Sequence, residues 1–299
     1  RVCQKGKDLV KLIFGLVVIT QLMVGWKKQN LKQNNMYKIS QSFLKDFSDY
    51  KSDFETVCGL QIKAKFFDGV EFPSSEAMDL GNYFEYKATG CLPRNGRVPE
   101  PRISYKGKKN ECVSAPFQRA NDSAEFYKKI IKEYGIEVLD VGTKLSNDKM
   151  NGIADIYAKW NGRYCFIDLK YSGLIDNRWD ERGWETNSLS EKHKLMIQGV
   201  QYTILAKDCL KHEYKDFDFY YFIFSQQDPN YVKIIHQVID VDTLDIHKKN
   251  VDFVYNQINS YPLDRIFKPK PTLKSCAKCP LFDDCDYSTS MPLIEKVYY

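Results

Sequence analysis

Histidine is scarce in this chain of 299 residues, and no apolar run is long enough to be an obvious membrane span. The four histidines are scattered along the sequence. The apolar run Leu12–Trp26 has 15 residues and is broken by Thr20 and Gln21, whereas a membrane-spanning helix needs about 20. No internal repeat is visible. The sequence therefore argues against a repeat architecture and contains no clear transmembrane helix.

The chain also lacks a charge excess over most of its length. Its net charge is +5, but residues 1–35 hold seven basic side chains against one acidic side chain. The remaining 264 residues hold 37 basic and 38 acidic side chains and are close to neutral. Overall charge is therefore no argument for nucleic acid, and any such binding must use local patches. With 43% hydrophobic and 14% aromatic residues, the chain can nevertheless build a sizeable core.

Cysteine is too sparse and too unevenly spaced for a disulfide scaffold, but three of the nine cysteines cluster as Cys276-x-x-Cys279-Pro-x-x-x-x-Cys285. Cys58, far upstream, is a candidate fourth ligand. Four thiolates without a nearby histidine suit a 4Fe–4S cluster or zinc in a reducing compartment. The alternative is that these cysteines are buried packing residues. The other cysteines show no ligand spacing, and we expect them to pack in the interior: Cys3, Cys91, Cys112, Cys165 and Cys209.

Residues 1–35 differ from the rest of the chain, and three interpretations stay open. Lysines precede the apolar run, as in a signal peptide or anchor, but no small-residue cleavage site is obvious. Met36 opens a stretch of ordinary globular character. We expect residues 1–35 to be upstream translation or a non-essential extension; an added helix on the body and a true targeting segment are the alternatives. Residues 36–299 then form a single domain that includes a cysteine-rich module at 268–287.

Residues 151–171 predict a β-hairpin around which the domain is organised. Asn161-Gly162 lies between two apolar stretches, and a type I′ turn needs positive φ at both of its central residues. The first strand carries Asp155. The second carries Asp168 and Lys170, which are two residues apart and therefore point to the same face of the sheet. Two acids and a lysine on one face are costly to bury without a function.

The other elements predict an α/β fold with a mixed central sheet flanked by helices. Ser40 or Ser42 is a candidate N-cap for a first short helix. Residues 91–115 are expected to be a long loop or a partly ordered insertion, and residues 172–189 a polar loop. Three strands in succession that include a hairpin, followed by helix, strand, strand and helix, imply a mixed sheet. The expected helices are 78–89, from 121 or 123 to about 134, 190–207, and from 242 or 243 to about 260, and the expected further strands are 136–145, 217–225 and 231–241.

The acids of the hairpin predict a divalent metal site. Carboxylates on adjacent strands can share one Mg²⁺ or Mn²⁺, and such an ion would lower the pKa of a bound water. Lys170 would position or deprotonate that water, because the pKa of a lysine falls when it is desolvated near a cation. The alternative is a surface hairpin with solvated charges.

Two further pairs could complete this site. Gln198 and Tyr202 are four residues apart on the expected helix 190–207, so they share one helical face that could meet Lys170 or a phosphate. Tyr202 could equally be a core residue. Gly81-x-x-x-Glu85 offers a third carboxylate from an earlier helix. His193 lies five residues before Gln198, where it either lines the site or is solvated.

Taken together, these motifs resemble the RecB-family exonucleases of the PD-(D/E)XK superfamily, in particular the iron–sulfur branch that contains the CRISPR-associated adaptation exonucleases and the AddB nuclease domain. The resemblance covers roughly residues 37–287. Two positions depart from the family pattern: Gly59 follows the first cysteine in place of the usual proline, and Glu85 stands where histidine is frequent. The matching residues are Ser40 or Ser42, Cys58, Gly81 and Glu85, Gly152 and Asp155, Asp168 and Lys170, Gln198 and Tyr202, and Cys276, Cys279 and Cys285.

The resemblance implies a PD-(D/E)XK restriction-endonuclease-like core and a Mg²⁺- or Mn²⁺-dependent deoxyribonuclease, an exonuclease acting on single-stranded or frayed DNA ends in recombination, repair, or phage or CRISPR DNA processing. Glu85, Asp155, Asp168 and the backbone carbonyl of Leu169 would hold the metal. Lys170 would assist the attacking water. Gln198 and Tyr202 would orient Lys170 or the substrate strand. Cys58, Cys276, Cys279 and Cys285 would hold a structural 4Fe–4S cluster, with Zn²⁺ as the alternative.

For partners and location, the resemblance implies DNA, recombination or CRISPR adaptation proteins, no membrane for residues 36–299, and the cytoplasm of a bacterial or phage-infected cell. We expect phosphate contacts from Lys268, Lys270, Lys274 and Lys278. Trp179 and Trp184 are candidates to stack on unpaired bases, with packing as the alternative. Two other functions stay open: a catalytically silent nuclease fold that binds nucleic acid, and a zinc-stabilised interaction protein.

Overall fold

The computed structural model describes residues 36–51, 57–93, 96–105, 111–175, 184, 193–276 and 279–287. The predicted extension 1–35 lies outside these residues. The chain divides into two units, Arg1–Tyr37 and Lys38–Tyr299, and the description below concerns the second. Among the described residues, no helix is both long enough and apolar enough to cross a membrane.

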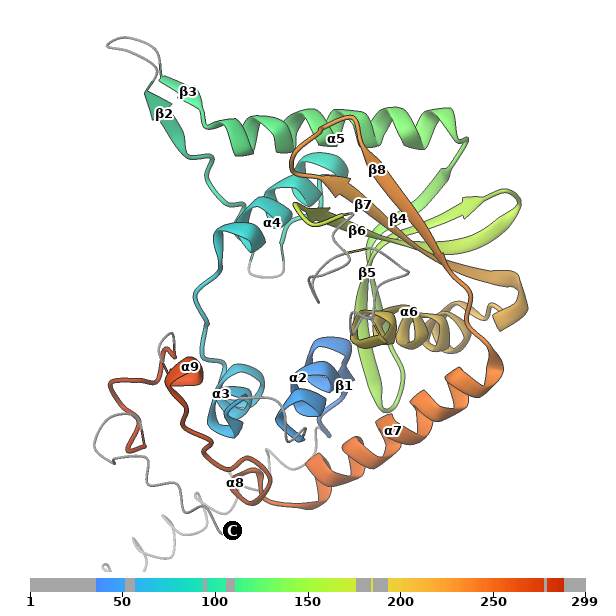
Figure 1. Cartoon of the computed structure of the whole chain (residues 1–299). Helices are drawn as coiled ribbons and strands as arrows, with labels where there is room; N and C mark the ends of the chain where they lie inside the picture. The colour runs from blue at the N-terminus through green and yellow to red at the C-terminus, as the bar shows by residue number, and fades with distance from the viewer. Residues whose placement is uncertain are drawn as a thin grey trace, which may run out of the picture. The chain divides into compact units, whose positions relative to one another are not determined.

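A six-stranded mixed sheet forms the centre of this unit, as the sequence predicts (Figure 1). Five strands lie in the order β1-β5-β6-β7-β8, and β4 pairs with β5 in addition. The pairs β1–β5 and β6–β7 are parallel, and the other pairs are antiparallel. The strands are β1 (Ile39–Ser40), β4 (Glu137–Ser146), β5 (Met150–Trp160), β6 (Arg163–Ser172), β7 (Phe217–Ser225) and β8 (Val232–Gln237).

The predicted hairpin is present as β5 and β6. Trp160 pairs with Arg163 across the turn. The turn residues Asn161 and Gly162 have φ angles of 50° and 79°, the positive values that a type I′ turn requires. The local signal in the sequence was therefore sufficient to fix this hairpin.

One face of the sheet is covered by α4 (Glu76–Thr89) and α5 (Ala115–Glu133) (Figure 1). Their buried side chains meet apolar residues of β5, β6 and β7 in one core. Large rings fill this layer: Phe84 stacks on Tyr171 with ring centroids 5.0 Å apart. Burying this many apolar side chains contributes about 1.5–3 kcal/mol for each large residue. The layer fixes α4, and with it Glu85, against the hairpin.

The opposite face is covered by α6 (His193–Leu205), which continues as a π-helix, η2 (Ala206–Leu210). Helix α7 (Val241–Ser260) packs on α6. The contacts here are aromatic: Tyr202 of α6 lies against Phe166 and Phe219, with ring centroids 6.1 and 6.2 Å away. This face places Gln198 and Tyr202 next to the strands that carry Asp155 and Asp168.

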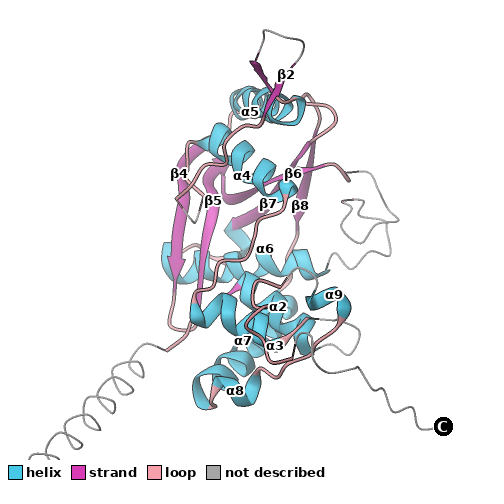
Figure 2. Cartoon of the chain, turned by 90° about the vertical axis from the view of Figure 1, so that its left-hand side faces the viewer, coloured by secondary structure: helices cyan, strands magenta, loops and turns pink. Residues whose placement is uncertain are grey.

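Two segments that are far apart in the sequence, residues 41–68 and 263–276, lie side by side (Figure 2). The buried hydroxyl of Tyr50 donates to the Ile266 carbonyl over 3.0 Å and accepts from the Lys268 N–H over 2.8 Å. The ring of Phe267 lies against those of Phe43 and Phe47, with centroids 6.4 and 6.1 Å away. The elements joined in this way are α2 (Gln41–Lys51), α3 (Gly59–Lys63), η1 (Ala64–Asp68), α8 (Leu263–Ile266) and α9 (Leu273–Cys276).

Several predicted boundaries were wrong. The helix expected from residue 121 or 123 is α5, which already begins at Ala115 with a proline in its first turn, a position that proline tolerates. The expected loop 91–115 contains a small antiparallel hairpin, β2 (Ile103–Tyr105) and β3 (Glu111–Val113).

Two more helices begin earlier than predicted. Helix α4 begins at Glu76, and the Ser75 side chain caps it. Helix α7 begins at Val241, and Asp240 caps it by accepting from the Thr243 N–H. The expected cap at Ser40 is present: its hydroxyl accepts from the Phe43 N–H over 3.2 Å.

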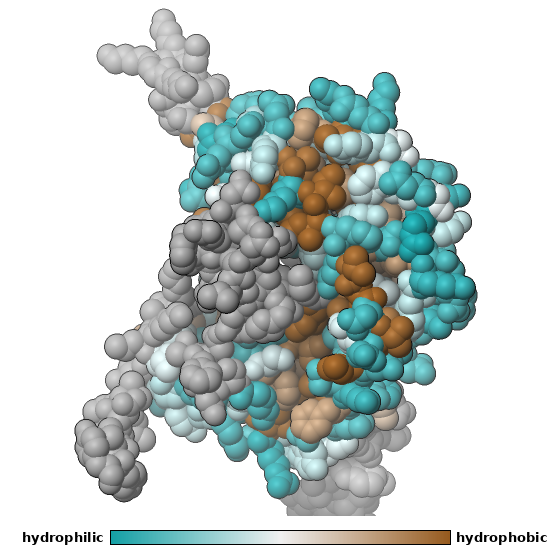
Figure 3. Space-filling view, turned by 45° about the vertical axis from the view of Figure 1, so that its right-hand side comes forward, coloured by the Kyte–Doolittle hydropathy of each residue, from teal (hydrophilic) through white to brown (hydrophobic). Residues whose placement is uncertain are grey.

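Some apolar side chains remain exposed near the junction of β8 and α7. Val238, Val241, Ile246 and Phe253 are exposed. On the face that Figure 3 shows, apolar residues gather in patches between hydrophilic side chains. Exposed apolar residues of this kind are normal on protein surfaces.

Candidate active site

The site forms where β5 and β6 separate. The ladder between the two strands runs from Trp160–Arg163 to Ile156–Ile167. Beyond that pair, the Leu169 N–H is bound by a side chain: it donates to Oδ2 of Asp155 over 2.8 Å. Since the N–H and C=O of one strand residue point to the same edge, the Leu169 carbonyl also faces β5. The strand separation thus brings Asp155 and the Leu169 backbone together.

Beyond the end of the β5–β6 pairing, side chains of α6 bind backbone carbonyls of β5. The Tyr202 hydroxyl donates to the Ile153 carbonyl over 2.7 Å. The Gln201 amide donates to the carbonyls of Asn151 and Ile39, over 3.0 and 3.1 Å. Gln201 is fully buried. Its bonds therefore give hydrogen-bond partners to carbonyls whose burial without a partner would lower the stability of the fold. Sequence reasoning missed Gln201, although its polar side chain stands among apolar neighbours on an expected helix.

Gly152 has a steric role at this point. A Cβ on Gly152 would lie 2.3 Å from Cε1 of Tyr202, which is far below van der Waals contact. The Tyr202 ring is buried and fixed by its hydroxyl bond. The glycine of the G-x-x-D motif therefore lets α6 approach β5 closely.

Asp168 is the most buried of the three acids of the site. It is 2% exposed. Its Oδ2 forms an ion pair with the Lys170 ammonium, and its Oδ1 accepts from the Gln198 amide. The prediction placed Gln198 on Lys170 or phosphate; in the structure it holds the carboxylate instead, because α6 faces the strand position of Asp168. A buried carboxylate needs such partners.

The carboxylates repel one another. Burial raises the pKa of Asp155 well above its usual range, and the charges of Asp168 and Glu85 raise it further. Burial lowers the pKa of Lys170, but the charges of Asp168 and Asp155 outweigh burial, so its pKa lies above the ordinary lysine value. The expectation that the pKa of Lys170 falls concerns a lysine beside a bound cation, so it stays a prediction.

Glu85 reaches the site from α4. It is half-buried, and its charge acts on Asp155 and on the nearby thiol of Cys91. No group of three His, Cys, Asp or Glu side chains among the described residues is arranged to hold a metal ion. Glu85, Asp155 and Asp168 therefore influence one another electrostatically without forming a closed ligand set.

Tyr221 is a second residue that sequence reasoning missed. It pairs with Asp168 across the parallel β6–β7 ladder. Its hydroxyl is held by the backbone N–H of Gly199 on α6. Trp184 packs on its ring with centroids 5.5 Å apart and is 7% exposed. For Trp184 the packing interpretation holds and base stacking does not, whereas Trp179 lies outside the described residues.

The four predicted cysteine ligands line one small cavity of about 20 Å³. Cys58 is buried, and the other three are half-buried. None of the four forms a disulfide. The Sγ of Cys58 accepts from the Lys270 N–H over 3.3 Å. The fold therefore brings Cys58 to the cavity that Cys276, Cys279 and Cys285 line, although no such group among the described residues is arranged to hold a metal ion.

The glycine after Cys58 has a clear physical reason. The Gly59 N–H donates to the Lys268 carbonyl over 3.1 Å, a bond that proline could not make. A Cβ on Gly59 would lie 2.4 Å from that same oxygen. The neighbouring Lys270 was expected to contact phosphate; instead its ammonium donates to the Tyr50 carbonyl over 2.8 Å. Lys278 and the side chain of Lys274 lie outside the described residues.

Comparison with known proteins indicates the fold. No protein family and no curated protein matches the chain. Among solved structures, it is similar to one named "Putative exonuclease" from Eubacterium rectale, with 18% identity, a TM-score of 0.55, and coverage of 91% of this chain and 93% of that chain. A structure of SSO0001 aligns with 13% identity, a TM-score of 0.35, and coverage of 91% and 98%, which is too weak to carry an argument. The first likeness shows a shared fold.

Proposed function

We propose that the chain is a metal-dependent DNA nuclease that hydrolyses phosphodiester bonds at DNA ends. The observation that carries this proposal is that Asp155, Asp168 and Lys170 meet at the point where β5 and β6 separate, and that the charge of Glu85 acts on Asp155 there. Placing carboxylates that repel one another in a half-buried site lowers the stability of the fold. The shared fold with a protein named as an exonuclease supports the same conclusion.

The donor set fits a hard divalent cation by its chemistry. Carboxylate oxygens and a backbone carbonyl are the ligands that Mg²⁺ and Mn²⁺ prefer. In the protein without such an ion, Lys170 neutralises Asp168. We propose that Asp155, Asp168, Glu85 and the Leu169 carbonyl hold the ion. When bound, the ion would supply charge for the scissile phosphate and lower the pKa of its water.

The side chains around the acids have separate roles in this proposal. Gln198 holds Asp168 by its amide and so fixes the carboxylate that the ion would use. Tyr202 holds the backbone of β5 through the Ile153 carbonyl and acts as a positioning residue. Lys170, which pairs with Asp168, would lie beside the bound ion and would orient or deprotonate the attacking water.

Degradation of end-labelled DNA tests this function. We expect the purified protein to degrade single-stranded or frayed ends with Mg²⁺ or Mn²⁺ and not with EDTA. Lys170→Ala should lose at least about 100-fold in rate, the usual scale for a general acid or base. Lys128→Ala, an exposed lysine of α5, is the matched control and should cut as the parent does. A Lys170→Ala variant that cuts like the parent would contradict the assignment.

We also propose a metal centre at the four cysteines. Its support is that all four line one cavity and none is in a disulfide. Protein purified without air should be brown with broad visible absorbance if the centre is 4Fe–4S, and colourless with one equivalent of zinc if it is Zn²⁺. Protein that holds neither metal would contradict this second proposal and leave the nuclease proposal standing.

A further inference from the structure

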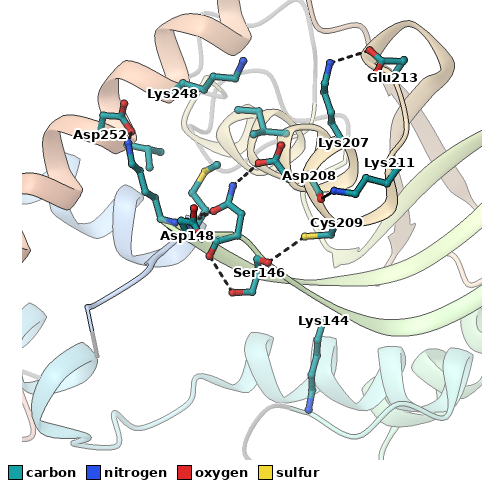
Figure 4. Close-up of a pocket in the computed structure, with 15 residues that line it drawn as sticks. Lys144, Ser146, Asp148, Lys207, Asp208, Cys209, Lys211, Glu213, Lys248 and Asp252 are labelled. Carbon is teal, nitrogen blue, oxygen red and sulfur yellow. Dashed lines mark hydrogen bonds and ion pairs between the residues drawn. The ribbon is translucent and has the colours of Figure 1, made fainter. Parts of the chain in front are cut away.

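A large hollow lies outside the candidate active site, where three elements meet. Its volume is about 1140 Å³. The walls are the turn between β4 and β5, the π-helix η2, and α7. Figure 4 shows its charged lining. Five lysines reach the hollow: Lys144, Lys149, Lys207, Lys211 and Lys248.

The three walls are tied to one another, so the hollow is formed in advance of any ligand. The Asn147 amide donates to the Asp208 carboxylate over 2.6 Å and joins the turn to η2. The Cys209 thiol donates to the Ser146 carbonyl over 3.4 Å. Lys149 pairs with Asp252 over 2.7 Å and joins the turn to α7. A hollow held in this way loses little entropy when a ligand enters.

Two of the lysines are held side by side although their charges repel. The ammonium of Lys207 lies 4.7 Å from the centre of the Tyr214 ring, and that of Lys248 lies 5.3 Å from the centre of the same ring. In Figure 4 they reach the hollow from different helices. The Glu213 carboxylate raises the pKa of Lys207, and the charge of Lys248 acts against it. Two ammonium groups held over the Tyr214 ring are positioned to bind one anion together.

The carboxylates of the lining do not cancel this arrangement. Four acids line the hollow with the five lysines, so its net charge is small. However, the Lys207–Glu213 pair is 38% and 60% exposed, and exposed ion pairs contribute little to stability. Such an ion pair can therefore open with a small loss of free energy. The lysine can then bind a phosphate in place of the carboxylate, and a phosphate accepts more hydrogen bonds.

The backbone beside these lysines is unusual. The π-helix η2 ends at Lys211, whose φ is +63°. A lysine in this left-handed region is uncommon, and π-helical turns are frequent at functional sites. The Lys211 ammonium donates to the Asp208 carbonyl over 2.7 Å. This bond holds the Lys211 ammonium beside Asp208 in the lining of the hollow.

We propose that this hollow binds the phosphate backbone of a nucleic-acid strand, with Lys207 and Lys248 as the central contacts. The inference rests on the proposed function, since it names a second place where a nuclease would hold its substrate. It does not use the acids of the candidate active site. Such binding is sequence-independent and falls with salt concentration.

Lys144 links the hollow to the candidate active site. It lines the hollow, yet in Figure 4 it points away from Lys207 and Lys248. Its charge acts on the Cys91 thiol, which the charges of Glu85 and Asp155 also reach. Met150 at the hollow and Asp155 are five residues apart on β5, roughly 17 Å at about 3.3 Å per residue. One nucleic-acid strand could therefore contact both places.

Fluorescence anisotropy of a labelled single-stranded oligonucleotide, measured in EDTA so that cleavage does not interfere, tests the proposal. We expect the double variant Lys207→Gln/Lys248→Gln to bind roughly tenfold more weakly, and its salt slope to be smaller by about 1.4 for two lost phosphate contacts. Lys207→Arg/Lys248→Arg should retain binding. The control Lys128→Gln/Lys132→Gln removes two lysines from α5 and should leave binding unchanged.

Glu213→Gln separates binding from a purely structural ion pair. If Lys207 and Glu213 only stabilise the fold, removing either one lowers stability and neither changes binding. If Lys207 binds phosphate, Glu213→Gln frees the Lys207 ammonium from its ion pair, and the oligonucleotide should bind more tightly. Unchanged affinity in the lysine double variant, or equal weakening in the α5 control, would overturn the proposal. So would preferential binding of a nucleoside triphosphate that displaces the oligonucleotide, because the occupant would then be a small nucleotide.

The two proposals fail in different ways. If the parent binds the oligonucleotide through the hollow but never cleaves DNA, the nuclease proposal is wrong and the binding site stands. If the parent cleaves, and the lysine double variant binds and cleaves as well as the parent does, the hollow is not a strand-binding site and the nuclease proposal stands.

Discussion

The carboxylate of Asp155 accepts a hydrogen bond from the backbone N–H of Leu169 over 2.8 Å, at the point where β5 and β6 cease to pair. One residue thus has two roles. It completes the hydrogen bonding of the separated strands, and it is one of three acids that charge the candidate active site.

Substitutions at Asp155 separate these roles. Asp155→Asn keeps a side-chain oxygen for the Leu169 N–H and removes the charge that burial, Asp168 and Glu85 make unfavourable. We expect this variant to be at least as stable as the parent in EDTA. Asp155→Ala leaves the N–H without a partner and should cost about 1–3 kcal/mol. Urea unfolding measures both, and equal stability of the two variants would contradict the bonding role.

The close approach of Gly152 and Tyr202 predicts a steric effect. Gly152→Ala would place a methyl group 2.3 Å from a ring carbon of Tyr202, and we expect a loss of about 1–3 kcal/mol in the free energy of unfolding. Gly81→Ala is the matched control: a Cβ there meets nothing within 4 Å, and alanine favours the helix by about 0.5–1 kcal/mol. If both alanine variants shift urea unfolding in the same direction, the packing account fails.

The hydrogen bonds of Tyr50 predict how α2 is held against the segment that follows α8. Tyr50→Phe keeps the ring but removes the bonds to the Ile266 carbonyl and the Lys268 N–H. We expect a loss of about 1–3 kcal/mol, of the same size before and after metal is stripped with a chelator, because the bonds do not involve the cysteines. Tyr134→Phe, at an exposed ring, should have no effect. A loss seen only in metal-loaded protein would instead make the cysteine centre the tie.

His247 predicts a pH dependence of stability. Burial lowers its pKa to about 4, below the ordinary value of about 6.5. The unfolded chain therefore binds more protons between these values, and stability falls as pH decreases from about 6.5 to about 4, by about 3 kcal/mol in total. His247→Leu should remove this part of the slope. The difference between parent and variant in denaturant titrations isolates it, and parallel curves would show that His247 does not contribute.

Local signals in the sequence predicted more of this fold than long-range signals did. The Asn161-Gly162 turn depends on two adjacent residues, and the shared face of Asp168 and Lys170 depends on a period of two, so both could be read without the fold. Gln201 and Tyr221 could not, because their roles depend on β5 separating from β6 and on β7 lying beside Asp168. The hairpin of β2 and β3 was missed because three-residue strands show no period.

The cysteine cavity could be predicted only in part from local signals in the sequence. The cluster of three C-terminal cysteines is a local pattern, and its link to Cys58 could be guessed from the family resemblance. The reason for Gly59 could not, because it is the close passage of the Lys268 backbone, more than 200 residues away in the sequence.

Cleavage of end-labelled DNA by Asp155→Asn tests the central claim most directly, since this variant keeps the Leu169 hydrogen bond while losing one charge of the acid group. We predict that the parent degrades the DNA in Mg²⁺ or Mn²⁺, and that Asp155→Asn, folded and at least equally stable, loses at least about 100-fold in rate. An Asp155→Asn protein that degrades DNA as fast as the parent would contradict the account.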